Sequence, residues 1–205
     1  AFILSGLLII QLFVYIDAHA QKKEGEVRRL LGEAYVSKKD FTAAEKEFRA
    51  VLDDNPSDVR AREALADVLS YQKQYAQAVG EYRKVLDADP ENRVAAEKLA
   101  DVYSWNKEYD KAIKVYFGLM EKGPVNDSMA EKLADILTWE KRYGEAAEIY
   151  SSILERSPGN KKVIRKLAAL SSWSDNYERA LDLYKKILKE DPDDIDALLG
   201  IGEIQ

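Results

Sequence analysis

Cysteine is absent from this 205-residue sequence, and histidine occurs once, at His19. The lack of cysteine excludes disulfides, thiolate metal ligands and cysteine nucleophiles. A single histidine excludes the Ser-His and Cys-His pairs of hydrolases and the multi-histidine sites that bind zinc. We therefore predict that the chain is not an enzyme and that it binds no metal and no cofactor.

Positive charge is also in short supply. The 31 lysine and arginine residues are outnumbered by 37 aspartate and glutamate residues, which leaves a formal net charge of −6. Proteins that bind nucleic acid gather lysine and arginine against the phosphates. The balance of charge thus predicts no nucleic-acid partner.

Proline and glycine are scarce, with five and ten residues respectively, while alanine, leucine, glutamate and lysine are abundant. This composition favours helix over strand or disorder. The prolines stand at a constant interval of 34 residues, at Pro56, Pro90, Pro124, Pro158 and Pro192. A fixed period of this length indicates an array of repeats, each packing mainly against its neighbours.

The other residues follow the same period. With position 1 of successive repeats at Gly25, Val59, Arg93, Asp127 and Lys161, position 7 is always leucine and position 20 is always alanine. Position 8 is small, and positions 17 and 24 are aromatic. The members of position 8 are Gly32, Ala66, Ala100, Ala134 and Ala168; those of position 24 are Phe48, Tyr82, Tyr116, Tyr150 and Tyr184.

This alternation of large and small residues at helical spacing predicts two antiparallel helices per repeat, over roughly positions 2–14 and 18–30. The small residues allow the two helices to approach closely. Proline at position 32 ends the second helix. Ser57, Asn92, Asp127 and Asp194 are the expected N-caps of the helices that follow.

Over residues 25–205 this pattern resembles the tetratricopeptide repeat. The resemblance lies in the 34-residue period, the small residue at position 8, the aromatics at 17 and 24, Ala at 20 and Pro at 32. The resemblance implies an all-α fold, a right-handed solenoid of antiparallel helix pairs, with a partial sixth repeat from Ile195. One departure is notable. The usual tryptophan of position 4 is missing, and an aromatic residue stands at position 13 instead.

The array is preceded by an apolar stretch, AFILSGLLIIQLFVYI, over residues 1–16. As a helix it would be about 24 Å long, somewhat less than the hydrocarbon core of a bilayer. We expect residues 1–20 to be either an uncleaved transmembrane anchor or a signal peptide cut after Ala18-His19-Ala20, with 21–24 as a polar tether. The first case predicts a membrane-anchored, periplasm-facing protein, and the second a secreted or periplasmic one.

In the family that the repeats resemble, the first helices line a concave groove, and positions 5 and 9 are expected to face it. Carboxylates dominate these positions in the middle repeats, which predicts an acidic groove for a partner segment that carries lysine or arginine. The alternative is a solvated face in which neighbours such as Arg62, Lys98 and Lys132 offset each charge. The residues concerned are Glu63, Asp67, Glu97, Asp101, Glu131 and Asp135.

Position 13 is aromatic in four successive repeats, at Tyr71, Trp105, Trp139 and Trp173. These residues are expected to form a ladder that anchors partner side chains or stacks on sugar rings. In the alternative interpretation each ring fills the gap between neighbouring repeats and replaces the missing tryptophan of position 4.

The function predicted from these features is a non-enzymatic scaffold, a membrane-tethered subunit whose groove holds a partner protein of a membrane complex. The set of lysine and asparagine residues with which family members grip C-terminal carboxylates is absent, so we do not expect a chaperone-tail receptor. The Leu-Ala-Asp-x-x-Ser-Trp motif also resembles repeats of bacterial envelope proteins. That resemblance implies an alternative, a part in exopolysaccharide export or outer-membrane assembly, with polysaccharide as a possible ligand.

Overall fold

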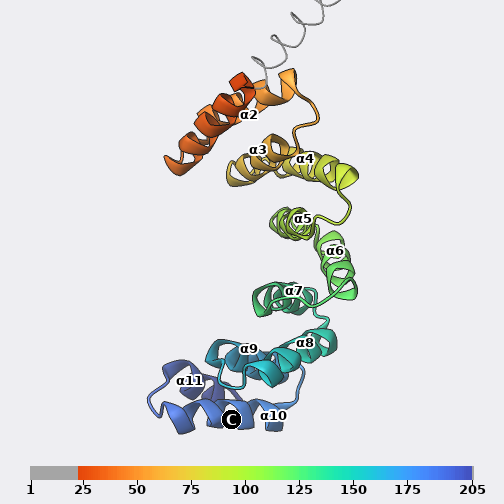
Figure 1. The fold of residues 1–205 in the computed structure, drawn as a ribbon. Coiled ribbons are helices and arrows are strands. Elements are labelled where there is room, and N and C mark those ends of the chain that lie inside the picture. The colour runs from red at the N-terminus through yellow and green to blue at the C-terminus, as the bar shows by residue number, and fades with distance from the viewer. Residues whose placement is uncertain (1–22, 205) are drawn as a thin grey trace, which may run out of the picture. The chain divides into compact units, whose positions relative to one another are not determined.

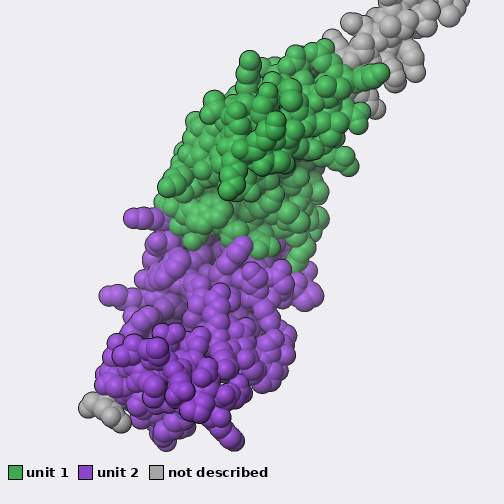
Figure 2. Space-filling view, turned by 90° about the vertical axis from the view of Figure 1, so that its left-hand side faces the viewer, with its two compact units in different colours: residues 1–106 green, residues 107–205 purple. Residues whose placement is uncertain are grey.

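The computed structural model describes residues 23–204, and the chain divides into two compact units, residues 1–106 and 107–205 (Figure 2). The predicted anchor or signal, residues 1–20, lies outside the described residues. Within the part that is described, no helix combines the length and the apolar character that crossing a membrane requires.

The first unit holds a helix over residues 23–37, followed by α2 (Phe41–Asp54), α3 (Val59–Tyr71), α4 (Tyr75–Ala88) and α5 (Arg93–Trp105) (Figure 1). Helices that are neighbours in sequence pack against each other: α2 on α3, α3 on α4 and α4 on α5. This is the helix-pair arrangement that the period predicts.

The second unit continues the pattern with α6 (Tyr109–Glu121), α7 (Asp127–Trp139), α8 (Tyr143–Arg156), α9 (Lys161–Trp173), α10 (Tyr177–Glu190) and α11 (Ile195–Ile204) (Figure 1). Here too α7 packs on α8, α8 on α9, α9 on α10 and α10 on α11. The all-helical prediction is confirmed for the described residues of both units.

The predicted helix bounds are close to those observed. First helices such as α3, α5, α7 and α9 span positions 1–13, and α4, α8 and α10 span positions 17–30. The predicted ranges, 2–14 and 18–30, therefore began one residue late, and the first range also ended one residue late. The aromatic of position 17 is inside the second helix rather than before it.

Two of the four predicted caps are correct. Asn92 accepts a hydrogen bond from the Ala95 amide, and Asp194 accepts one from the Ala197 amide. Ser57 and Asp127 are wrong by one residue, because the cap is always position 34 of the preceding repeat. Asp58 caps α3 and Asn126 caps α7, as Asn160, which was not predicted, caps α9.

The two displaced residues have other contacts. The Ser57 hydroxyl donates to Asn55 Oδ1 at 2.8 Å within the turn. Asp127 is the first residue of α7 and accepts hydrogen bonds from Arg156 and Ser157. Both polar side chains are therefore used, but neither supplies the first acceptor for the amides at a helix start.

The core of each repeat is built where small and large residues meet. The alanines of position 20 are fully buried, as are the aromatic rings of Phe48, Tyr82, Tyr116 and Tyr150 at position 24. Gly32 shows how close the approach is, because a Cβ there would lie 2.6 Å from the Phe48 ring. Interiors packed this tightly do not accept an added methyl group without a shift of the backbone or the ring.

The turn inside each repeat has an unusual backbone. Position 15 adopts a left-handed conformation with φ between 59° and 61°, although glycine occurs at none of these positions. A side chain with a Cβ is disfavoured in this region by roughly 1 kcal/mol. The residues are Lys39, Lys73, Lys107, Lys141 and Asp175.

Candidate partner-binding surface

The aromatic residues of position 13 end the first helices. Tyr71, Trp105, Trp139 and Trp173 are the last residues of α3, α5, α7 and α9, and between 52% and 61% of each is exposed. Tryptophan and tyrosine are among the side chains that most often dominate the binding energy of an interface. We call these four residues the turn-edge aromatics.

The rings of Tyr71, Trp105 and Trp139 each lie beside the aromatic that begins the second helix of the repeat before it. The ring centroids of Phe41 and Tyr71 are 5.1 Å apart, and those of Tyr75 and Trp105 are 6.3 Å apart. In the second unit, Tyr109 and Trp139 are 5.9 Å apart. The rings therefore sit between neighbouring repeats, as the alternative interpretation has it, but their exposure shows that they are not core fillers.

The predicted groove carboxylates are engaged in a contact that links neighbouring repeats. In the first unit, Asp67 accepts a hydrogen bond from the buried Tyr82 hydroxyl and another, at 2.6 Å, from Lys98 Nζ on α5. Burial and the adjacent Asp67 carboxylate raise the pKa of Tyr82 far above its usual range. The tyrosine thus stays a donor at any ordinary pH.

The same contact recurs in the second unit. Asp135 accepts from the Tyr150 hydroxyl and from Lys166 Nζ, whose distances to the two carboxylate oxygens are 2.7 and 2.6 Å. Burial, together with Asp135, likewise raises the pKa of Tyr150. We call such a set of tyrosine, aspartate and lysine an inter-repeat triad.

Lys166 also binds Glu131, at 2.6 Å, and Lys162 binds the same Glu131 oxygen at 2.6 Å. Burial opposes ionisation of Glu131, but the hydrogen bonds from Lys162 and Lys166 outweigh it and lower its pKa. Glu131 is consequently a charged residue held between two cations.

The remaining predicted carboxylates belong to α3 and α5. Glu63 accepts a hydrogen bond of 3.3 Å from the Asn92 side chain, while Glu97 and Asp101 are partly buried on α5. Of the neighbours expected to offset these charges, Lys98 pairs with Asp67, but Arg62 instead pairs with Glu81 of α4 at 2.6 Å. Much of the acidic character of the groove is therefore balanced within the repeats themselves.

Sequence reasoning named Lys98 and Lys132 of position 6 as neighbours that offset the carboxylates, but it missed Lys166 and the tyrosine of position 24, although the signal was available. Repeats 2 to 4 have tyrosine at position 24 and aspartate at position 9, and lysine follows at position 6 of the next repeat. Where position 24 is Phe48, the next position 6 is Ala64; where position 9 is Ala169, it is Gly200. Aspartate at position 9 and lysine at the next position 6 occur together in repeats 2 and 4, where the contact is observed. Both are missing in repeats 1 and 5, although repeat 5 keeps its tyrosine, Tyr184.

No group of three His, Cys, Asp or Glu side chains among residues 23–204 is arranged to hold a metal ion. The surface of the described residues is thus best characterised by its exposed aromatics and its paired charges.

Sequence profiles of the tetratricopeptide repeat match residues 29–93, 69–136 and 139–200. The chain therefore belongs to the tetratricopeptide repeat family. No curated protein matches the chain in sequence.

Solved structures agree with this assignment at the level of the fold. A tetratricopeptide repeat protein from Parabacteroides merdae is 19% identical, with a TM-score of 0.78 over 89% of this chain and 72% of that one. YrrB, described as a tetratricopeptide repeat protein with an unusual peptide-binding site, is 19% identical, with a TM-score of 0.73 over 90% of this chain and 95% of its own. MamA is 18% identical, with a TM-score of 0.76 over 83% and 93%.

Proposed function

We propose that this chain is a non-enzymatic scaffold that binds a partner protein through the turn-edge aromatics. The observation that carries the proposal is the exposure of Trp105, Trp139 and Trp173, each more than half open to solvent at the same repeat position. Tryptophan is the residue most enriched among those that dominate binding energy. The rings of Trp105 and Trp139 also pack against an aromatic of the preceding repeat, so these two side chains lose little entropy on binding.

The carboxylates have a smaller part in this proposal than the aromatics do. Asp67 and Asp135 already bind lysines of the neighbouring repeats, so a basic partner segment would have to compete with those lysines. A groove for a lysine- or arginine-bearing segment is therefore a secondary contact in this proposal.

The scaffold is proposed to act at a membrane. The support is the apolar run of residues 1–16, which suits an anchor helix, or a signal peptide that exports the repeats. In either case the repeats would face the periplasm of a bacterial cell, next to a membrane complex.

Site-specific photo-cross-linking in cells tests the role of the aromatics. A photoreactive phenylalanine analogue at Trp139 is expected to trap a defined protein, identified by mass spectrometry, whereas the same analogue at Val94 is not. Val94 is a suitable control because it is 61% exposed but lies in the first turn of α5, away from the turn edge. Equal yields at the two positions would count against the proposal. Mass spectrometry of the intact chain from membranes shows in the same preparation whether residues 1–20 are retained.

A second candidate is the binding of a polysaccharide, favoured by the amide groups beside the aromatics of the first unit. Gln72, Lys73 and Gln74 lie between Tyr71 and Tyr75, and the Gln77 amide donates to Gln74 at 2.7 Å. An aromatic face with amides next to it can stack on a sugar ring and bind its hydroxyls. Saturable quenching of tryptophan fluorescence by an acidic or neutral exopolysaccharide is expected; an unchanged spectrum would exclude this candidate.

A further inference from the structure

A cleft of about 500 Å³ opens between α6 and α8 in the second unit, away from the turn edge. Phe117 and Met120 of α6 and Val125 of the following turn form one wall, and Ile149 of α8 lies opposite. Glu148 and Arg156 mark two polar points on its border. The volume and the mainly apolar lining are those of a site for a ligand or a large side chain.

Two of the residues that make this cleft apolar, Phe117 and Val125, stand at positions where the third repeat departs from the others. Position 25 is Phe117 here, but Arg49, Arg83, Ser151 or Lys185 elsewhere. Position 33 is Val125 here, but Ser57, Glu91, Gly159 or Asp193 elsewhere. The repeat architecture is therefore satisfied by polar side chains at both positions, and it does not account for the apolar ones.

The turn after α6 departs as well. Position 31 is Gly123 here, with φ of 147°, whereas the other repeats have Asp, Asn or Ser at this position. Helix α6 is also one residue shorter, with 13 residues where α4, α8 and α10 have 14. Only glycine adopts this backbone readily. The altered turn places Pro124 and Val125 at the end of the cleft.

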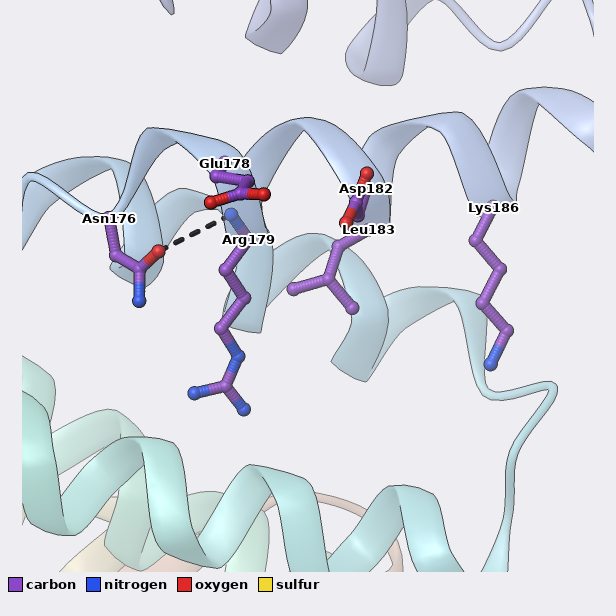
Figure 3. Close-up of a pocket in the computed structure, with 6 residues that line it drawn as sticks. All are labelled: Asn176, Glu178, Arg179, Asp182, Leu183 and Lys186. Carbon is purple, nitrogen blue, oxygen red and sulfur yellow. Dashed lines mark hydrogen bonds between the residues drawn. The ribbon is translucent and has the colours of Figure 1, made fainter.

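A second cleft in the same unit, which we call the α8–α10 cleft, is lined by α10 and the residue before it (Figure 3). Two of its cationic side chains reach α8 and the turn after α8. Arg179 and Lys186 extend from α10 on either side of Leu183. Arg179 Nη2 donates to Ser151 at 2.8 Å, and Lys186 Nζ donates to the Pro158 carbonyl at 3.0 Å. In the first unit, Arg49 of α2 likewise reaches Gln77 of α4 at 3.0 Å.

In the α6–α8 cleft, two positions that carry cations in its counterparts carry other residues. Ser152 stands at the repeat position that Lys186 occupies in the α8–α10 cleft, and Phe117 stands at the position of Arg49. The cleft is consequently apolar at these two positions, where its counterparts carry cations.

The charges at its border favour one kind of ligand. Arg156 binds Asp127 through both Nε, at 3.0 Å, and Nη2, at 2.7 Å, so its charge is already balanced. Glu148 is exposed and forms no ion pair within the described residues. A cation beside the apolar group of a ligand would find an available partner in Glu148.

We propose that this cleft binds an apolar side chain of a partner peptide, with a lysine or arginine of the same peptide on Glu148. The proposal rests on the chain's function as a protein-binding scaffold, and it adds a second surface with its own specificity. Phe117 and the flexible Met120 form the wall that accepts the apolar side chain.

The test is a selection of random twelve-residue peptides displayed on phage, carried out on the full chain after depletion on a Phe117→Arg variant. The variant should fold, because the chain itself has arginine at this position in its first two repeats. The selected peptides are expected to combine large apolar residues with lysine or arginine. A synthetic copy, followed by fluorescence anisotropy, should lose at least tenfold in affinity with Phe117→Arg.

The charge contact is tested by Glu148→Lys, which introduces the residue found at the same position in Lys46 and Lys114. It should weaken the basic peptide at least fivefold. Lys185→Arg, a change at position 25 of another repeat, serves as the matched control and should leave the affinity unchanged.

The two proposals can fail separately. A selected peptide that survives Phe117→Arg but is lost in Trp139→Ala would overturn the cleft and support the turn-edge aromatics. Peptides enriched in acidic residues would also overturn it, as would the absence of any peptide that distinguishes the wild type from Phe117→Arg. If the cleft takes up only a small apolar probe such as anilinonaphthalene sulfonate, it is not a peptide site.

Discussion

The inter-repeat triad of Tyr150, Asp135 and Lys166 makes a quantitative prediction for stability. Tyr150→Phe removes a hydroxyl that donates to a carboxylate, and it leaves a side chain that the chain already uses as Phe48. Hydrogen bonds to charged groups contribute about 1.5 kcal/mol or somewhat more. We expect the free energy of unfolding to fall by about 1.5 kcal/mol.

Asp135→Ala removes the same hydrogen bond together with the ion pair to Lys166. The side chains of this pair are 29% and 28% exposed, and Lys166 keeps its contact with Glu131, so the pair itself is worth only about 0.5 kcal/mol. The expected loss is about 2 kcal/mol. Because the hydrogen bond is lost only once, the double variant should lose about 2 kcal/mol as well, a coupling energy of about 1.5 kcal/mol.

Urea unfolding followed by circular dichroism measures the free energy of unfolding of all three variants. Because arrays of repeats can unfold in parts, the slope of this free energy against urea concentration must be the same in each variant. Tyr184→Phe is the matched control. Position 9 of its repeat is Ala169 rather than aspartate, so the loss there should stay within about 0.5 kcal/mol. A coupling energy below about 0.5 kcal/mol between Tyr150 and Asp135 would refute the reasoning.

Three further predictions concern single positions. Lys141→Gly should stabilise the chain by about 0.5–1 kcal/mol in urea unfolding, because φ is 59° there, whereas Lys141→Ala should bring no gain. Gly32→Ala should lower the free energy of unfolding by about 1–3 kcal/mol, because the new Cβ would meet the Phe48 ring at 2.6 Å. Gly25→Ala, whose Cβ would meet nothing within 4 Å, should instead stabilise its helix. Equal effects of the two changes would contradict the packing argument. The hydrogen bond from Arg165 holds the pKa of Asp194 below its usual range. The stability that the Asp194 carboxylate contributes is therefore present at neutral pH and is lost as the pH falls below about 4. Asp194→Asn keeps a capping side chain and should flatten this acid loss, as measured by thermal melts from pH 7 to 2.5.

The repeat architecture was predictable to within one residue because it depends on local patterns. Proline at 32, alanine at 20 and the aromatics at 17 and 24 act within one helix pair, and each pair repeats the same signals. The caps were harder. Polar residues that can cap stand side by side, as in Ser57-Asp58 and Asn126-Asp127, and only the backbone decides which of the two precedes the helix.

The candidate surface was predictable only in part. The aromatic ladder is in the sequence, but whether Trp105 or Trp139 is a core residue or an exposed one depends on the repeat beside it. The carboxylates illustrate the same limit, because Asp67 and Lys98 are 31 residues apart and meet only when two repeats stack.

By itself, then, the sequence determined the period, the helix pairs, the membership of a repeat family and the absence of cysteine chemistry, all of which follow from composition and short-range spacing. The tertiary structure decided what the polar and aromatic side chains do. Stacking turned Asp67 and Asp135 into links between repeats, left the turn-edge aromatics open to solvent, and brought Phe117 of one repeat opposite Ile149 of the next. These are contacts between residues that only the packing of successive helices brings together.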